Sequence, residues 1–163
     1  MNAPMILSPA ALAKIDRELP KYPPDQKVSA VMSALRIAQE EKGWLSTETM
    51  EFIAQYLDMP AVAVYEVATF YTMYNLAPTG KYKLTVCTNL PCALSGAGAA
   101  VDRLKEKLGV DLGETTADGR FTLKEGECFG ACGDAPVLLV NNKRMCSFMS
   151  REAIDRLLAE LAE

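Results

Sequence analysis

The sequence contains no histidine among its 163 residues. This absence excludes Ser-His-Asp and Cys-His catalysis, mixed Cys/His zinc sites, Rieske-type ligation and the C-x-x-C-H attachment of haem. The sequence also lacks any apolar run long enough for a membrane-spanning helix. It has no stretch in which lysine and arginine gather. We therefore expect neither direct insertion into a membrane nor a nucleic-acid partner.

The N-terminal residues carry no basic segment followed by an apolar core, so they do not resemble a signal peptide. Asp16 and Glu18 follow early, unlike the acid-poor composition of a transit peptide. These features predict a cytoplasmic protein in a reducing compartment, where structural disulfides are rare. Five cysteines in such a chain call for another explanation, and metal binding is the usual one.

Residues 1–77 are predicted to form a small helical bundle. Apolar residues recur there at i, i+3, i+4 and i+7, the spacing of one helix face. Each of the four expected helices begins at a capping residue or a proline: Ser8, Asp25, Ser46 and Pro60. The bundle ends in an aromatic-rich segment that we expect to pack in the core and between the two halves of the chain: Phe70, Tyr71, Met73 and Tyr74.

Residues 78–163 are predicted to form an α/β domain. Alternating or short apolar runs indicate four strands: 81–86, 120–124, 137–140 and 144–149. A helix is expected from about Cys92 to Leu108, and Ser150 is expected to cap a last helix. The order strand, helix, strand, strand, strand, helix resembles the thioredoxin-like arrangement. The whole chain is therefore predicted to be of the α/β (α+β) class, with a helical domain before a thioredoxin-like one.

Four of the five cysteines form two close pairs. Cys87 and Cys92 make a C-x4-C motif where a strand ends and a helix begins. Cys128 and Cys132 make a C-x3-C motif in a glycine-rich loop. Four thiolates from two loops are what a binuclear iron–sulfur cluster requires, two for each iron. The small residues between and after the second pair allow backbone N–H groups to approach the sulfurs.

Other interpretations of the cysteines stay open at this point. A structural zinc site also accepts four cysteines, although its usual knuckle is C-x2-C. A thiol–disulfide enzyme favours C-x-x-C, which neither pair has. The fifth cysteine, Cys146, falls in a predicted strand on the same face as Phe148, and we expect it to be a small buried hydrophobic residue.

The segments C-T-N-L-P-C and C-F-G-A-C-G-D-A-P together resemble the family of thioredoxin-like [2Fe–2S] subunits of respiratory complex I. The segments Glu66–Tyr74 and Gly43–Ser46 are also similar to that family. The resemblance runs from about Leu35 to the C-terminus. It implies that Cys87, Cys92, Cys128 and Cys132 hold one [2Fe–2S] cluster and that the chain has no catalytic residue of its own.

The resemblance further implies an electron carrier within NADH–quinone oxidoreductase, at the cytoplasmic face of the membrane. The neighbouring subunit binds FMN and NADH in that family, and the helical first half of this chain packs on it. The equivalent subunit of an NAD-linked formate dehydrogenase or bidirectional hydrogenase is an alternative, because it shares the cysteine pattern. A zinc-stabilised scaffold is an alternative of another class.

Overall fold

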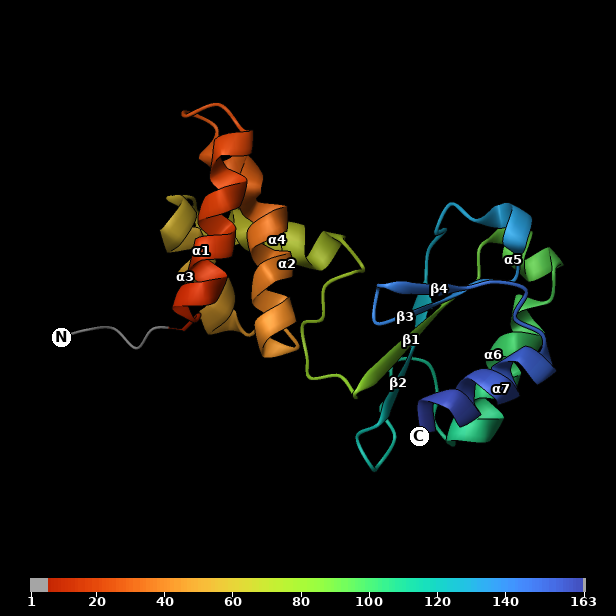
Figure 1. The fold of residues 1–163 in the computed structure, drawn as a ribbon. Helices are drawn as coiled ribbons and strands as arrows, with labels where there is room; N and C mark the ends of the chain where they lie inside the picture. Colours follow the sequence, from red (N-terminus) through yellow and green to blue (C-terminus); the bar gives the residue numbers. More distant parts are fainter. Residues whose placement is uncertain (1–5, 163) are drawn as a thin grey trace. The chain divides into compact units, whose positions relative to one another are not determined.

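The computed structural model describes residues 6–162, and the chain divides into two compact units, Met1–Pro78 and Thr79–Glu163 (Figure 1). Residues 1–5, which belong to the predicted helical bundle, lie outside the described residues. Within the described part, no helix has both the length and the apolar character needed to cross a membrane.

The first unit consists of helices α1 to α4. Their bounds are Pro9–Glu18, Val31–Lys42, Thr47–Leu57 and Ala61–Phe70. Two of the predicted helix starts are confirmed by their caps. The Ala11 N–H donates to Ser8 Oγ at 3.1 Å, and the Thr49 N–H donates to Ser46 Oγ at 3.2 Å.

The predicted cap at Asp25 is wrong. A short 3-10 turn, Lys27–Ala30, leads into α2, and neither the turn nor the helix has a side-chain cap at its start. The chain enters α2 through backbone turns instead, since the Gln26 N–H donates to the Pro23 carbonyl oxygen at 2.8 Å. The first orphan N–H groups of a helix can be satisfied in this way without a capping side chain.

Tyr74 is the one residue of the aromatic-rich segment that enters the core of the first unit. It is 3% exposed and packs with the α2 and α3 core residues, and its hydroxyl donates to the Met32 carbonyl oxygen at 2.9 Å. Phe70, Tyr71 and Met73 do not enter the core of the first unit and are 77%, 38% and 38% exposed, so the expected core packing is wrong for them, while their packing between the two halves stays a prediction. Helix α4 ends at Phe70, so the helical periodicity that would have turned these side chains inward stops there.

Replacing Tyr74 with phenylalanine tests this buried hydroxyl. Burial raises the pKa of Tyr74 to about 12, so the folded chain holds this proton between about pH 10 and 12 while the unfolded chain releases it. The stability that the protonated hydroxyl contributes is complete below about pH 10 and is lost as the pH rises towards 12. We expect Y74F to lose about 1 kcal/mol at pH 7, from the missing hydrogen bond. Its unfolding free energy should then fall less steeply than that of the wild type above pH 10, as denaturant titrations at several pH values will measure. An equally steep fall in Y74F would contradict the assignment.

The second unit is a four-stranded sheet in the order β2-β1-β3-β4. The strands are β1 (Tyr82–Cys87), β2 (Phe121–Gly126), β3 (Leu138–Val140) and β4 (Arg144–Cys146). β1 runs parallel to β2 and antiparallel to β3, and β3 is antiparallel to β4. A parallel strand pair joined by a helix, followed by an antiparallel pair and a last helix, confirms the predicted α/β class and its thioredoxin-like order.

Helices α6 (Ala97–Leu108) and α7 (Arg151–Ala162) cover one face of this sheet (Figure 1). They pack on the apolar side chains that alternate along the strands, including Leu84, Leu123 and Leu138. A bidentate ion pair ties the two helices together, with Arg103 Nε and Nη2 at 2.9 and 2.5 Å from the Asp155 carboxylate.

Two predicted elements of the second unit differ from the observed ones by a break or by more than two residues. The helix expected from Cys92 to Leu108 is two helices, α5 (Leu90–Leu94) and α6, because Gly96 adopts a φ of 96° between them. That left-handed backbone is open to glycine and breaks the helix. The strand expected over residues 144–149 ends at Cys146, and Phe148 has a φ of 52°, which a strand does not allow.

Candidate metal centre

The parallel pairing of β1 and β2 brings the two cysteine motifs to one edge of the sheet. Cys87, the last residue of β1, pairs in register with Gly126, the last residue of β2. Cys128 follows two residues later. The Thr88 N–H donates to the Gly126 carbonyl oxygen at 3.4 Å, which joins the two chain segments as they leave the sheet. Two motifs that are far apart in sequence therefore open from adjacent strand ends.

The first cysteine pair lies inside the unit. Cys87 and Cys92 are each 1% exposed and form a small cluster with Ala97 and Val137. Burial raises the pKa of the Cys87 thiol, and the adjacent Cys92 thiol raises it further. The backbone N–H groups of Asn89 and Phe129 point at the Cys87 sulfur and act in the opposite direction. The site therefore supplies N–H donors for a negatively charged sulfur, from both cysteine loops.

The second cysteine pair lies at the surface. The Cys128 and Cys132 sulfurs are 3.7 Å apart, and the Gly130 N–H donates to Cys128 Sγ at 3.4 Å. The predicted approach of backbone N–H groups to a sulfur is thus confirmed at Gly130, whose φ of 76° is accessible to glycine. Hydrogen bonding to Cys128 raises the pKa of the Cys132 thiol, and the charge of Cys87 adds to this.

The four thiols form two pairs, one buried and one exposed. Among the described residues, no group of three or more cysteine and carboxylate side chains is placed to hold a single metal ion. A [2Fe–2S] cluster uses two thiolates for each iron, so two pairs at one sheet edge fit it. Each thiol must lose its proton on metal binding. The pKa values of the Cys87 and Cys132 thiols are raised, by burial and by the neighbouring Cys128 thiol respectively, and thiolate binding to iron acts against both shifts.

Gly126 is a residue of the site whose role the sequence did not indicate. A Cβ atom there would lie 2.6 Å from Thr85 Cγ2 and 2.6 Å from Cζ of Phe129. Because Gly126 has no side chain, the Phe129 ring can pack against the sheet at this position. Since the Phe129 N–H faces the Cys87 sulfur, this close packing fixes one of the N–H donors of the site.

Hydrogen bonds between loops hold the two motifs together. Asn89 Nδ2 donates to Glu127 Oε2 at 2.6 Å, and Thr88 Oγ1 donates to Glu125 Oε1 at 2.5 Å. Each bond joins a residue after Cys87 to one just before Cys128. No sequence pattern marks these pairs, because their members are 37 or 38 residues apart.

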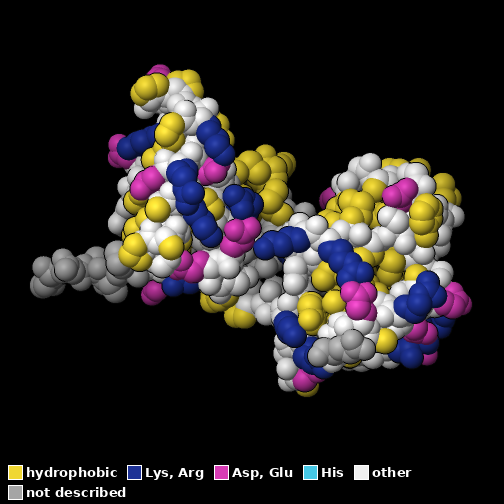
Figure 2. Space-filling model, viewed as in Figure 1, with side chains coloured by type: hydrophobic (Ala, Val, Ile, Leu, Met, Phe, Trp, Pro, Cys, Tyr) yellow, Lys and Arg dark blue, Asp and Glu magenta, His cyan; other side chains and the backbone are white. Residues whose placement is uncertain are grey.

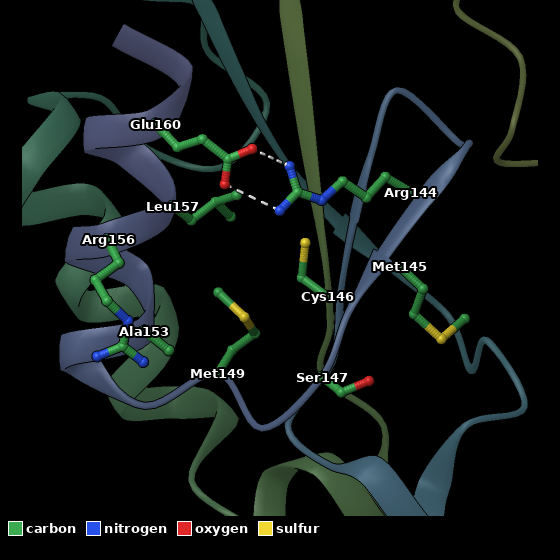
Figure 3. Close-up of a pocket in the computed structure, with 9 residues that line it drawn as sticks. All are labelled: Arg144, Met145, Cys146, Ser147, Met149, Ala153, Arg156, Leu157 and Glu160. Carbon is green, nitrogen blue, oxygen red and sulfur yellow. Dashed lines mark hydrogen bonds and ion pairs between the residues drawn. The ribbon is translucent and has the colours of Figure 1, made fainter. Parts of the chain in front are cut away.

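Cys146 lies apart from the four paired cysteines. It is half-buried and packs against the sheet core rather than with Cys87 and Cys92. Figure 3 shows its sulfur and that of Met149 pointing into a pocket of about 290 Å³, which the ion pair between Arg144 and Glu160 borders. Burial raises the pKa of the Cys146 thiol. The expected full burial of Cys146 is wrong, since the residue is only half-buried against the core, and Phe148 does not share its face and is 64% exposed.

The fold and the paired cysteines define a class of iron–sulfur electron carriers with a thioredoxin-like domain. The model of the thioredoxin-like [2Fe–2S] ferredoxin family matches residues 15–162. Among solved structures, an NAD⁺-reducing [NiFe]-hydrogenase superposes with a TM-score of 0.69 at 21% identity, over 81% of this chain and 22% of the hydrogenase chain. That likeness concerns the fold alone.

The curated relatives are more similar in sequence. An NADH-quinone oxidoreductase subunit from Rickettsia conorii is 50% identical over 123 residues, 75% of this chain and 74% of the relative. NADH-quinone oxidoreductase subunit 2 of Thermus thermophilus is 41% identical over 147 residues, 90% of this chain and 81% of the relative. The chain belongs to the thioredoxin-like [2Fe–2S] ferredoxin family, in the group that includes these NADH-quinone oxidoreductase subunits.

Proposed function

We propose that this chain is the electron-transfer subunit of an NADH–quinone oxidoreductase, with its [2Fe–2S] cluster held by Cys87, Cys92, Cys128 and Cys132. Membership of the [2Fe–2S] family supports the assignment of the cofactor. The relatives named above support the assignment of the complex. The observation that carries the ligand assignment is the meeting of two cysteine pairs at the ends of the parallel strands β1 and β2.

A [2Fe–2S] cluster accepts and releases one electron at a time. The residues of this chain bind it, set its surroundings and control its exposure. Cys87 and Cys92 would hold one side in the interior, where water is excluded, and Cys128 and Cys132 would hold the other at the surface. The N–H groups of Asn89, Phe129 and Gly130 stabilise negative charge on the sulfurs and so affect the reduction potential. This role requires no proton transfer by the chain and no covalent bond to be made or broken.

The partner that follows from this role is the subunit that binds FMN and NADH. We propose that this subunit and the rest of the peripheral arm hold the chain at the cytoplasmic face of the membrane. The alternative complex is an NAD-linked hydrogenase or formate dehydrogenase. The hydrogenase shares the fold but not a close sequence, whereas the identity of 50% to the Rickettsia conorii relative supports the respiratory complex.

Anaerobic purification tests the cofactor and the role together. We expect about two irons and two acid-labile sulfides per chain, with no EPR signal when oxidised and an S = ½ signal after reduction. Adding catalytic amounts of the FMN-loaded NADH-binding subunit, with NADH, should reduce the oxidised cluster, one NADH supplying one electron to each of two chains. Zinc without sulfide, from cells supplied with iron, would favour the scaffold interpretation.

A further inference from the structure

Thr85 carries the one buried side-chain oxygen or nitrogen atom that has no hydrogen-bond partner among residues 6–162. The residue is 6% exposed. A buried hydroxyl without a partner costs free energy, so such a group calls for an explanation. Thr122, a buried threonine on the adjacent strand, shows the usual arrangement. Its hydroxyl bonds to Thr115 Oγ1 and accepts from the Gly80 N–H, both at 2.7 Å.

The strands on either side of Thr85 offer its hydroxyl no side-chain acceptor. Thr85 pairs in register with Lys124 on β2 and with Leu139 on β3. A lysine ammonium group is a donor only, and a leucine side chain has no polar atom. The hydroxyl proton of Thr85 therefore lacks an acceptor, and these neighbouring side chains do not supply one.

The Thr85 side chain lies beside the end of the sheet that carries the cysteines. Side chains alternate along a strand, so Thr85 and Cys87 share one face of β1. Thr85 Cγ2 lies against Gly126, 2.6 Å from the position of a Cβ there, and the Phe129 ring meets the same position. Since the Phe129 N–H faces the Cys87 sulfur, the Thr85 side chain and this sulfur have a neighbour in common.

The sulfur atoms of a [2Fe–2S] cluster are acceptors of the kind that Thr85 lacks. Thiolate and sulfide sulfurs carry negative charge, and hydrogen bonds to them raise the reduction potential because reduction adds an electron. Figure 2 shows apolar atoms gathered on the second unit where Figure 1 labels α5. A hydrogen bond in apolar surroundings is electrostatically stronger than one in water, so a single hydroxyl there has a measurable effect.

We propose that the Thr85 hydroxyl donates a hydrogen bond to the sulfur atoms of the bound cluster and thereby raises its reduction potential. Thr85 then joins the backbone N–H donors of Asn89, Phe129 and Gly130, and it is the one side-chain donor that we assign. This inference rests on the proposed function, because it requires the cluster. It adds a residue that is not a ligand and that lies outside both cysteine motifs.

A redox titration of the cluster-loaded full chain, followed by EPR, tests the proposal. Thr85→Val keeps the shape of the side chain and removes the donor. At the wild-type midpoint potential, its ratio of reduced to oxidised cluster should be roughly threefold lower, the size expected for one hydrogen bond. This corresponds to a midpoint about 30 mV more negative for a one-electron couple. Thr85→Ser keeps the hydroxyl and should titrate like the wild type.

Thr122→Val is the matched control. It also removes a buried hydroxyl, but one whose partners are groups of the protein. It should lower the unfolding temperature and leave the midpoint potential unchanged. If Thr85→Val takes up no cluster, Thr85→Ala supplies the comparison without a donor.

Equal midpoint potentials in the loaded wild type and Thr85→Val would show that the hydroxyl does not reach the cluster. That result would overturn this inference and leave the proposed function standing. An equal shift in Thr85→Val and Thr85→Ser would assign the effect to packing of the methyl group, and it would also overturn the inference. A wild-type chain that holds no cluster would refute the proposed function, and this inference with it.

Discussion

Substituting Cys132 with alanine is expected to abolish cluster assembly. The remaining three thiols would leave one iron with a single cysteine, and a [2Fe–2S] cluster needs two for each iron. Cys132 is exposed at the surface, so its replacement removes a ligand without opening a cavity in the core. Iron and sulfide should fall from about two per chain to a small fraction of that, and the S = ½ signal should disappear.

Cys146→Ala is the matched control for this experiment. Cys146 is half-buried beside the sheet core and belongs to neither cysteine pair. Its loss should leave iron, sulfide and the EPR spectrum unchanged and reduce stability by about 1 kcal/mol. A Cys132→Ala protein with full iron and an unaltered spectrum would contradict the assignment of Cys132 as a ligand. Loss of the cluster in Cys146→Ala would mean that Cys146 is also needed to hold the cluster, which contradicts our assignment of four ligands.

Substituting Gly126 with alanine is expected to destabilise the second unit and weaken its hold on the cluster. The new Cβ would lie 2.6 Å from both Thr85 Cγ2 and the Phe129 ring, and overpacking of this kind costs about 1–3 kcal/mol. Displacement of Phe129 would also move its N–H away from the Cys87 sulfur. Denaturant unfolding measures the first effect, and the rate of iron release to a chelator measures the second.

Gly98→Ala is the control for Gly126→Ala. Gly98 lies in α6, and a Cβ there meets no heavy atom within 4 Å. This substitution should not destabilise the second unit, because alanine favours a helix over glycine by about 1 kcal/mol. If both variants release iron equally fast, the close approach at Gly126 is not what fixes the site.

The prediction of helices from sequence succeeded where a capping side chain marked the start of the helix. Ser8 and Ser46 cap helices because a serine oxygen satisfies an N–H within its own turn. Such a contact depends on neighbours three residues away and on little else. The prediction failed at Phe148, where a hydrogen bond to Asp134 outweighs the strand pattern.

The sequence by itself determined the cysteine pairs, the absence of histidine and the order of strands and helices, and the resemblance of its two cysteine segments to a known family indicated the [2Fe–2S] class. These features depend on residue identity and short spacing, which are visible along the chain. Only the tertiary structure decided that Cys87 ends its strand opposite Gly126 and that one cysteine pair is buried and the other exposed. Each of these depends on contacts between segments far apart in sequence, whose pairing is set by packing and sheet register rather than by a local pattern.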